Sequence, residues 1–399
     1  MGRLAAAAAV RHILETVTVR KRRRGRLLTI AIGAALAIQV PMVLAIGRLG
    51  HHLAASCAGA GALNVPFVLG MRNPWRDWGR SRLWLYLGLW PFFAWGAVCI
   101  AFTMIVPVGL LAALATPLTL DRALSACMAA AAAIGFRSLS GRPKRAAVEV
   151  PVNGLPPALD GYVIAQISDL HCGPLTPPAT VERWVDDVNA IGADLIAVTG
   201  DLITSGDSYV GAVAAALGRL RARDGVFACM GNHDYFTDGD ALARALERGG
   251  ISVLRNRGVT LARDDAQLYV GGVDDTWTAR NDVAGALAER PAGVPAVLLA
   301  HDPNLFPSAA AKGADLVLAG HTHGGQFAVP GFARRWNLAR VVTSFTCGLY
   351  QMDGATLYVN RGLGTTGPPI RMGARPEIAV LTLRPAAAGR GMARSADAA

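Results

Sequence analysis

Five apolar runs in the C-terminal two-thirds of the chain each end in residues that ligate metals or transfer protons. The clusters are Asp169-Leu170-His171, Gly200-Asp201, Gly231-Asn232-His233-Asp234, His301-Asp302 and Gly320-His321-Thr322-His323. A short apolar run bounded by Gly or polar residues is typical of a strand buried in a parallel sheet. Ligands of open α/β sheets bind beyond the carboxyl ends of such strands. The sequence therefore predicts that the five clusters meet at one place.

Seven residues of these clusters are candidate metal ligands: Asp169, His171, Asp201, Asn232, His301, His321 and His323. Carboxylate, imidazole and amide oxygen together suit borderline divalent ions better than Ca²⁺ or a thiolate zinc finger. A single His at a strand end is usually structural, but five of the eight His residues lie in these clusters. Seven ligands exceed the needs of one ion with open positions, which favours two ions and one bridging carboxylate.

Alternating strands and amphipathic helices position these clusters. Strand-like Tyr162–Ser168 precedes a helical stretch at Pro178–Ile191, and strand-like Leu195–Thr199 precedes another at Tyr209–Leu220. The clusters follow each other at about 30 residues, the length of one βαβ unit, which implies a parallel, right-handed start. Later strand signals predict a second sheet packed on the first, at Ala266–Val273, Val297–Ala300, Leu316–Ala319, Thr356–Asn360 and Ile378–Leu383.

The order DLH, GD, GNHD, an isolated His and GHTH resembles the five blocks of the calcineurin-like metallophosphoesterase superfamily. The longer strings SDLHCGP, GNHDY, HDPN, GHTHGGQ and LYVNRGLGTTGPPIRMGARPEI resemble its membrane-associated YkuE/YaeI-like bacterial branch, over roughly residues 148–385. The resemblance implies a four-layer α/β/β/α sandwich and a metal-dependent phosphoesterase.

Carried over position by position, the resemblance implies that Asp169, His171 and His323 hold one divalent ion and that Asn232, His301 and His321 hold a second, with Asp201 bridging. Manganese is the expected metal, and iron, zinc, nickel and cobalt are the alternatives. A hydroxide shared by two such ions attacks phosphorus in line. His233 would then give a proton to the leaving oxygen, and Asp234 would orient His233 and tune its charge.

Four further residues are weaker candidates for substrate contacts. Arg361 and Arg371 flank a Gly/Pro-rich loop. They are predicted either to bind a phosphate through bidentate hydrogen bonds or to be solvated surface charges. Asn304 is a substrate contact or a turn residue, and Gly325 lets the backbone pass near the metals or forms a plain turn. Cys172 lies beside a proposed ligand, although a packed free thiol is the better interpretation.

The basic charge of the chain belongs to its N-terminal part. Residues 1–150 hold 18 Lys and Arg against 4 Asp and Glu, whereas residues 151–399 hold 21 against 24. The chemical part is therefore slightly acidic, so no nucleic-acid partner is expected. The six Cys residues are scattered singly and form no C-x-x-C pair, which is not a disulfide framework.

Four apolar stretches in the first 137 residues predict membrane spans. They are Leu27–Gly47, Leu53–Met71, a run at Leu83–Ala115 that is too long for one straight span, and Ala123–Phe136. Four spans put the basic groups 20–26, 72–82 and 137–145 on one side, which should be the cytoplasm. The predicted layout is a basic segment at 1–26, a membrane region at 27–137, a linker at 138–160, a metallophosphoesterase domain at 161–385 and a disordered tail from 386. A twin-Arg export signal at RRRGRLL is the alternative.

The leading hypothesis is a phosphohydrolase anchored in the lipid bilayer of a bacterial inner membrane, with its catalytic domain in the cytoplasm. Anchoring favours a lipid-linked phosphate or pyrophosphate as substrate, and some members of this branch resemble hydrolases of UDP-diacylglucosamine in lipid A synthesis. A soluble nucleotide or phosphoprotein is also compatible. The alternative from another class is a non-catalytic scaffold or binding protein that keeps the fold, but such proteins are expected to lose ligands and none is missing here. A transporter regulated by the hydrolase is a third, weaker reading, since no charged residue marks the centre of a span.

Overall fold

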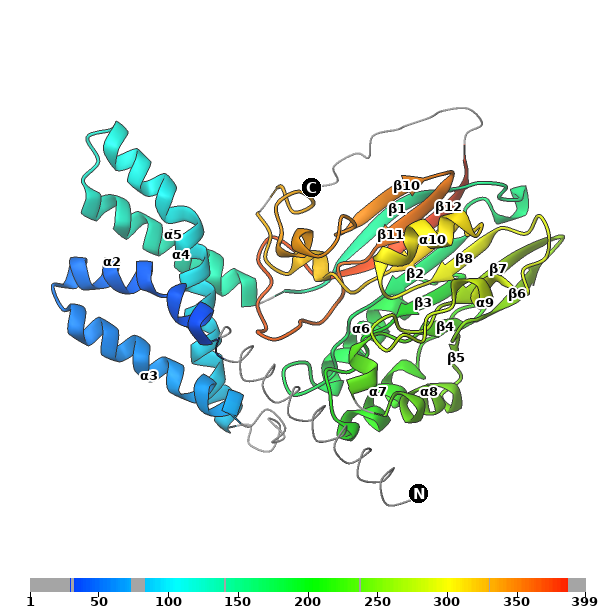
Figure 1. The fold of residues 1–399 in the computed structure, drawn as a ribbon, viewed down its shortest axis with the longest axis horizontal. Coiled ribbons are helices and arrows are strands. Elements are labelled where there is room, and N and C mark those ends of the chain that lie inside the picture. Colours follow the sequence, from blue (N-terminus) through cyan, green and yellow to red (C-terminus); the bar gives the residue numbers. More distant parts are fainter. Residues whose placement is uncertain are drawn as a thin grey trace, which may run out of the picture. The chain divides into compact units, whose positions relative to one another are not determined.

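The computed structural model describes residues 29, 32–72, 83–139, 141–236, 238–329 and 331–386. The chain divides into a helical unit, Met1–Leu139, and a second unit, Ser140–Ala399, which we call the catalytic unit (Figure 1). The predicted basic segment 1–26, the loop residues Arg76, Arg80 and Arg82, and nearly all of the predicted disordered tail lie outside the described residues.

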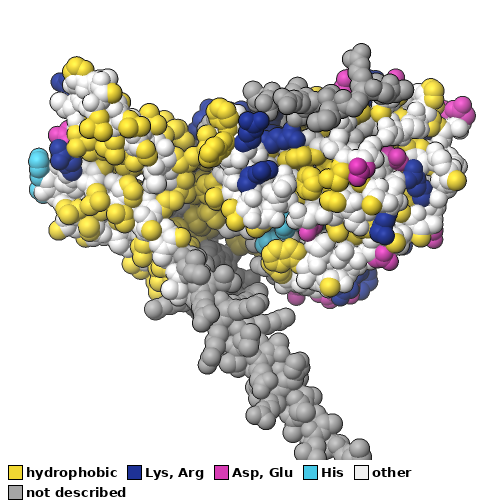
Figure 2. Space-filling model, turned by 45° about the horizontal axis from the view of Figure 1, so that its top comes forward, with side chains coloured by type: hydrophobic (Ala, Val, Ile, Leu, Met, Phe, Trp, Pro, Cys, Tyr) yellow, Lys and Arg dark blue, Asp and Glu magenta, His cyan; other side chains and the backbone are white. Residues whose placement is uncertain are grey.

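The helical unit contains α2 (Val40–Gly50), α3 (Leu53–Arg72), α4 (Trp90–Ala115), which continues from the π-helical turn η1 (Trp84–Leu89), and α5 (Leu120–Leu139). Three helical stretches among the described residues are long and apolar enough to cross a membrane: Ile32–Gly50, Leu53–Gly70 and Trp84–Ala115. Hydrophobic side chains dominate the face of this unit seen in Figure 2. The length and composition of these three stretches are therefore sufficient for helices that cross a membrane.

The fourth predicted span forms a helix but is not one of these candidates. Helix α5 carries Asp121 in its first turn and Arg137 in its last, and Ala makes up much of its length. Alanine gains much less than Leu or Ile from transfer into hydrocarbon, so the hydropathy of α5 stays low. The prediction of four spans is thus corrected to three candidates.

A buried polar cluster ties three segments of the helical unit together. The side-chain amides of Gln39 and Asn64 donate to each other's oxygens at 3.0 and 2.9 Å, and the Trp95 indole donates to Gln39 Oε1 at 2.8 Å. Because hydrocarbon offers no alternative partner for these groups, the cluster favours one packing arrangement of the helices.

Two six-stranded mixed sheets form the centre of the catalytic unit. The first has the order β1-β12-β2-β3-β4-β5 and the second β10-β11-β9-β8-β7-β6. The strands of the first sheet are β1 (Lys144–Val152), β12 (Glu377–Pro385), β2 (Val163–Ile167), β3 (Leu195–Thr199), β4 (Val226–Cys229) and β5 (Ser252–Val253). Those of the second are β10 (Gly348–Met352), β11 (Ala355–Val359), β9 (Leu316–Ala319), β8 (Ala296–Leu299), β7 (Ala266–Gly272) and β6 (Arg257–Arg263).

Two predicted assignments in this unit are corrected. Residues 144–152, predicted to lie in a linker, form β1 and pair in parallel with β12. Strand β12, predicted to belong to the second sheet, lies in the first sheet, where it also pairs antiparallel with β2. Both errors have one cause. The local sequence of a strand does not indicate which distant strand it pairs with, and β12 joins β1 and β2 from the other end of this unit.

Helices cover both outer faces of the sheet pair. On the first sheet lie α6 (Pro178–Asn189), α7 (Val210–Leu217) and α8 (Gly239–Arg248), and on the second lie α9 (Val283–Leu287) and α10 (Phe306–Ala311). The side chains of β3 show the layering: Ile196 and Val198 pack in one cluster with the three helices, whereas Leu195 and Ala197 pack against the second sheet. The predicted α/β/β/α sandwich is confirmed.

Parallel pairing brings the predicted clusters to one edge of this sandwich. Strands β2, β3 and β4 run in parallel in the first sheet, and β8 and β9 run in parallel in the second. Short 3-10 turns follow several of these strands, namely η4 (His233–Phe236), η5 (Pro303–Leu305) and η6 (His323–Gly325). The other 3-10 turns are η2 (Pro157–Leu159), η3 (Asp207–Tyr209) and η7 (Leu338–Val341).

Candidate metal centre

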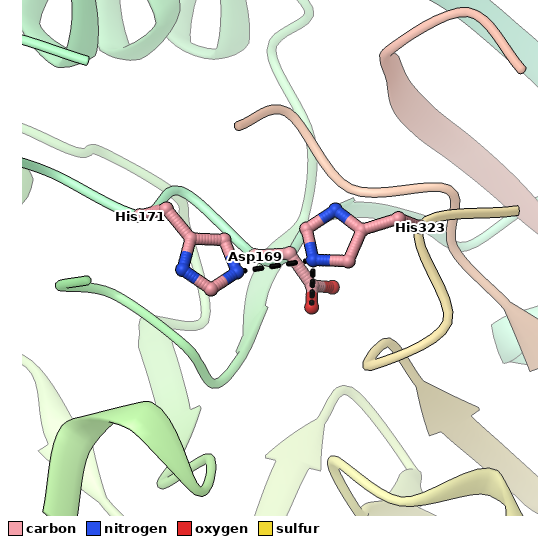
Figure 3. Close-up of side chains that lie close together, drawn as sticks. All are labelled: Asp169, His171 and His323. Carbon is pink, nitrogen blue, oxygen red and sulfur yellow. Dashed lines mark hydrogen bonds and ion pairs between the residues drawn. The ribbon is translucent and has the colours of Figure 1, made fainter. Parts of the chain in front are cut away.

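Three buried side chains from both sheets form a first ligand group. Asp169 and His171 follow β2 of the first sheet, and His323 follows β9 of the second. Nε2 of His171 lies 3.0 Å from Nε2 of His323, which lies 3.5 Å from Oδ1 of Asp169 (Figure 3). The three side chains point toward one another, and one ligand atom from each lies within 4.8 Å of the others. This geometry suits one divalent ion.

A second group forms beside the first around Asp201, which follows β3. Oδ2 of Asp201 lies 3.3 Å from Nε2 of His301, and Nε2 of His301 lies 3.2 Å from Nδ1 of His321. The same Asp201 oxygen lies 3.6 Å from Nε2 of His171 in the first group. Asp201 therefore lies between the two groups, which is the position of the bridging ligand that the resemblance implies.

Asn232 supplies the clearest sign that a cation belongs here. Its Oδ1 atom is buried and has no hydrogen-bond partner. A buried acceptor without a partner costs roughly 1–3 kcal/mol, so such atoms are rare. The Asn232 turn also contacts Asp201, whose Oδ1 accepts the backbone N–H of His233 at 2.8 Å. The residues present therefore fit two divalent cations.

The electrostatics of the groups favour cation binding. Burial lowers the pKa of His171 to about 3 and that of His323 well below its usual value, so both imidazoles are neutral. Burial alone would raise the pKa of Asp201, but His301 and His171 hold it well below the ordinary value. Burial opposes the charged form of His301, yet Asp201 raises its pKa to about 10. A bound cation would replace that proton as the partner of Asp201.

Strained backbone concentrates at the same place. Five of the seven candidate ligands have positive φ angles: Asp169, His171, Asp201, His321 and His323. Such conformations persist only where the surrounding structure fixes them, and they cluster at functional sites. Neighbouring glycines allow the close approach this requires, because a Cβ on Gly231 would lie 2.3 Å from Oδ1 of Asp201.

His233 lies beside the ligands, and one of its ring nitrogens forms a hydrogen bond within the protein. Its Nδ1 atom lies 3.0 Å from the carbonyl oxygen of Thr204, which can only accept, so Nδ1 carries a proton. The His233 ring centre lies 4.7 Å from that of His171. Nε2 is therefore the ring nitrogen not used in this contact, and the role of His233 as a proton donor stays a prediction.

The predicted role of Asp234 is corrected. Its carboxylate does not orient His233 but accepts backbone N–H groups from Asp201 at 3.1 Å, Leu202 at 2.8 Å and Gly231 at 2.9 Å. These bonds join the turn after β3 to the turn after β4. Asp234 therefore fixes the position of Asp201 relative to Asn232.

The two candidate arginines use their guanidinium groups within the protein. Arg371 is buried, donates to the carbonyl oxygens of Gly364 and Ala374, and lies 3.1 Å from Nδ1 of His323. Arg361 pairs with the buried carboxylate of Glu377 at 2.6 Å. This geometry does not support the predicted binding of a phosphate by these two guanidinium groups. Both residues instead stabilise the loop next to His323.

The remaining weak candidates also have structural partners. Oδ1 of Asn304 accepts the hydroxyl of Thr343 at 2.8 Å. Gly325 has φ +81°, and a Cβ there would lie 2.5 Å from Cβ of Asn337. Cys172 is buried in the core beside the first sheet, and burial raises its thiol pKa to about 12. No thiolate ligand is expected from Cys172.

Three residues at the centre have no counterpart among the predicted site residues. The Thr366 hydroxyl lies 2.8 Å from Nε2 of His323 and 3.1 Å from Nε2 of His171. The Trp277 ring is 67% exposed and lies 6.0 Å from the ring of His321, while the Phe236 ring lies 4.6 Å from that of His233. The one feature of the sequence that could have indicated any of these residues is the single Trp in the polar stretch DDTWTAR.

Comparison with known proteins agrees with this geometry. Residues 162–325 match the profile described as calcineurin-like phosphoesterase. A transmembrane protein with metallophosphoesterase domain from Danio rerio is 33% identical over 269 residues, which are 64% of this chain and 60% of that protein. The uncharacterized metallophosphoesterase YkuE of Bacillus subtilis (strain 168) is 34% identical over 239 residues, 58% of this chain and 82% of that protein.

The chain thus spans less than two thirds of the length of the zebrafish relative but most of the bacterial one. A solved archaeal phosphodiesterase aligns with 50% of this chain and 84% of its own at 15% identity and a TM-score of 0.28, a similarity too low to carry an argument. On these sequence matches, the chain belongs to the calcineurin-like metallophosphoesterase family.

Proposed function

We propose that the catalytic unit hydrolyses phosphate ester or pyrophosphate bonds with two divalent cations, one in each ligand group. One observation carries the proposal: Oδ2 of Asp201 faces both His171 and His301, at 3.6 and 3.3 Å. Asp169, His171 and His323 would hold one cation and Asn232, His301 and His321 the other, and the cations would supply charge to neutralise phosphate oxygens and to lower the pKa of a bound water. The mixed imidazole, carboxylate and amide donors favour manganese or a similar borderline ion.

The chain's own residues supply the other parts of the reaction. The backbone carbonyl of Thr204 holds His233 so that Nε2 can give a proton to the leaving oxygen. The Thr366 hydroxyl lies between two ligand imidazoles, where it can donate to a substrate oxygen. Trp277 offers an exposed aromatic face beside His321 for the leaving group.

We further propose that the chain is anchored in a bacterial inner membrane and acts on a lipid-linked phosphate or pyrophosphate. Three apolar helical stretches support the anchoring.

The direct test is hydrolysis by the full chain purified in detergent. With Mn²⁺ present we expect cleavage of p-nitrophenyl phosphate or its bis ester and about two bound ions per chain by elemental analysis. Asp201→Ala should abolish both. Bound ions without hydrolysis of any phosphate ester would contradict the proposal. Less than one bound ion would favour a non-catalytic scaffold.

A further inference from the structure

One segment of the catalytic unit exposes large apolar side chains that neither the fold nor the metal centre uses. Within residues 331–342, five such side chains are more than half exposed: Phe332 60%, Trp336 66%, Leu338 62%, Val341 85% and Val342 73%. Single exposed apolar residues are normal on a protein surface, but a group this dense marks a site of contact.

The backbone of this segment is hydrogen-bonded. The N–H of Trp336 donates to the carbonyl of Phe332, and the N–H of Val329 donates to the carbonyl of Trp336. Asn337 caps the turn η7 by accepting the N–H of Arg340 at 3.2 Å. Ala339 of the same turn is buried, so the segment has an inner side that packs and an outer side that carries the apolar residues.

The charge of the segment selects the kind of partner. Arg335 and Arg340 are exposed beside the apolar side chains, and no Asp or Glu occurs between Asp315 and Asp353. Apolar residues, a Trp and cations without acids match the interface of a bilayer that contains anionic lipids.

The segment is joined to the metal centre. The N–H of Leu338 donates to the carbonyl of Phe327, four residues after His323. Asn337 lies against Gly325, where there is no room for a Cβ. A force that positions this segment therefore also positions the turn that carries His323.

We propose that residues 331–342 insert into the bilayer interface and hold the metal centre at the membrane surface. Their role in bringing a lipid-linked phosphate to the metals rests on the proposed function, but the insertion itself does not.

Insertion is measured with a fluorescent label on the full chain. The exposed Cys57 is replaced (C57S), since the other described cysteines are buried. An environment-sensitive probe is placed by V341C, or by D265C in the exposed turn between β6 and β7 as a matched control. The proteins are reconstituted in vesicles of phosphatidylcholine and phosphatidylglycerol that contain a spin-labelled quencher lipid. We expect about twofold stronger quenching at V341C than at D265C.

Equal quenching at the two positions would overturn the proposal. A probe at V341C that is shielded from aqueous iodide but not quenched by lipid would also overturn it, because protein would then cover the segment.

Rates of hydrolysis on a soluble and a lipid substrate distinguish the failure of this proposal from the failure of the proposed function. The triple variant W336S/L338S/V341S should hydrolyse p-nitrophenyl phosphate at the unchanged rate but phosphatidic acid in vesicles about tenfold more slowly. Equal loss of both rates would overturn the role in presenting lipid. Strong quenching at V341C in a protein that hydrolyses p-nitrophenyl phosphate but no lipid phosphate would support the insertion and contradict the lipid substrate.

Discussion

Two regions of the catalytic unit reverse the usual distribution of side chains, in which polar groups are exposed and apolar groups are buried. The metal centre buries acids and imidazoles, including Asp169 and His171, whereas the segment 331–342 exposes Trp336 and Val341. Each arrangement is costly for an isolated chain, because burial removes acids and imidazoles from water, and exposure leaves apolar side chains in it. The missing partners differ in kind: a cation fits the first region and a bilayer fits the second.

The regions also differ in how they are built. The centre lies at the ends of strands that two sheets hold in register, and its strained backbone fixes each ligand. The segment is a series of turns that packs on the unit through few residues such as Ala339. Substitutions in the centre should therefore change the chemistry, and substitutions in the segment should change only where that chemistry takes place.

The largest effect is expected for Asp201→Asn. The amide keeps the shape of Asp201 but removes the charge that faces both His171 and His301. We expect loss of both ions and a fall in kcat/KM of roughly a thousandfold or more. Elemental analysis and p-nitrophenyl phosphate hydrolysis test this, with Glu182→Gln on the exposed face of α6 as control. A variant with normal metal content would disprove the bridging role.

His233→Asn should slow catalysis without removing metal. Loss of a positioned proton donor costs roughly a hundredfold or more in kcat, but little when the leaving group is as acidic as p-nitrophenol. The variant should thus be much slower on an alkyl phosphate than on p-nitrophenyl phosphate, with two ions still bound. An equal decrease on both substrates would mean that His233 acts in another way.

The sequence predicts well which residues meet at the centre, because strand ends are local features. Asp169, Asp201 and His301 each follow an apolar run; parallel pairing brings the first two to one edge of the first sheet, and the packing of the second sheet adds His301. The layers follow from the same alternation of strands and helices. In contrast, β12 enters the first sheet from the far end of the chain, a pairing that no local pattern specifies.

The roles of residues beside the ligands could not be predicted for the same reason. Asp234 accepts the backbone N–H groups of Asp201 and Leu202 from separations of 33 and 32 residues, and Thr366 reaches His171 from a separation of 195 residues. Arg371 has the type of a phosphate-binding residue, but its donors are taken up by carbonyl oxygens of its own loop. The residue type determines which groups a side chain can bind, and the fold determines which of those groups lie within its reach.

A medium effect is expected for Gly325→Ala, which lies between the two regions. Gly325 has φ +81° and no space for a Cβ, which would meet Asn337 at 2.5 Å. The free energy of unfolding should fall by about 1–3 kcal/mol, and hydrolysis should slow because His323 is two residues away. Gly293→Ala is the matched control, since Gly293 has φ +76° but nothing within 4 Å of a Cβ. If G293A slows hydrolysis as much as G325A, the contact with Asn337 does not connect the regions.

The smallest effect is expected for Val341→Ser. Val341 is 85% exposed, so replacing it should change the free energy of unfolding by less than about 0.5 kcal/mol. Val297→Ser is the comparison, because Val297 is fully buried between the sheets and its loss should cost about 2 kcal/mol or more. Denaturant unfolding of the full chain in detergent measures both values. If V341S destabilises the chain as much as V297S, other parts of the protein bury Val341, and its side chain is not available to a bilayer. If V341S is neutral, Val341 contributes nothing measurable to the fold, and its side chain is available to a bilayer.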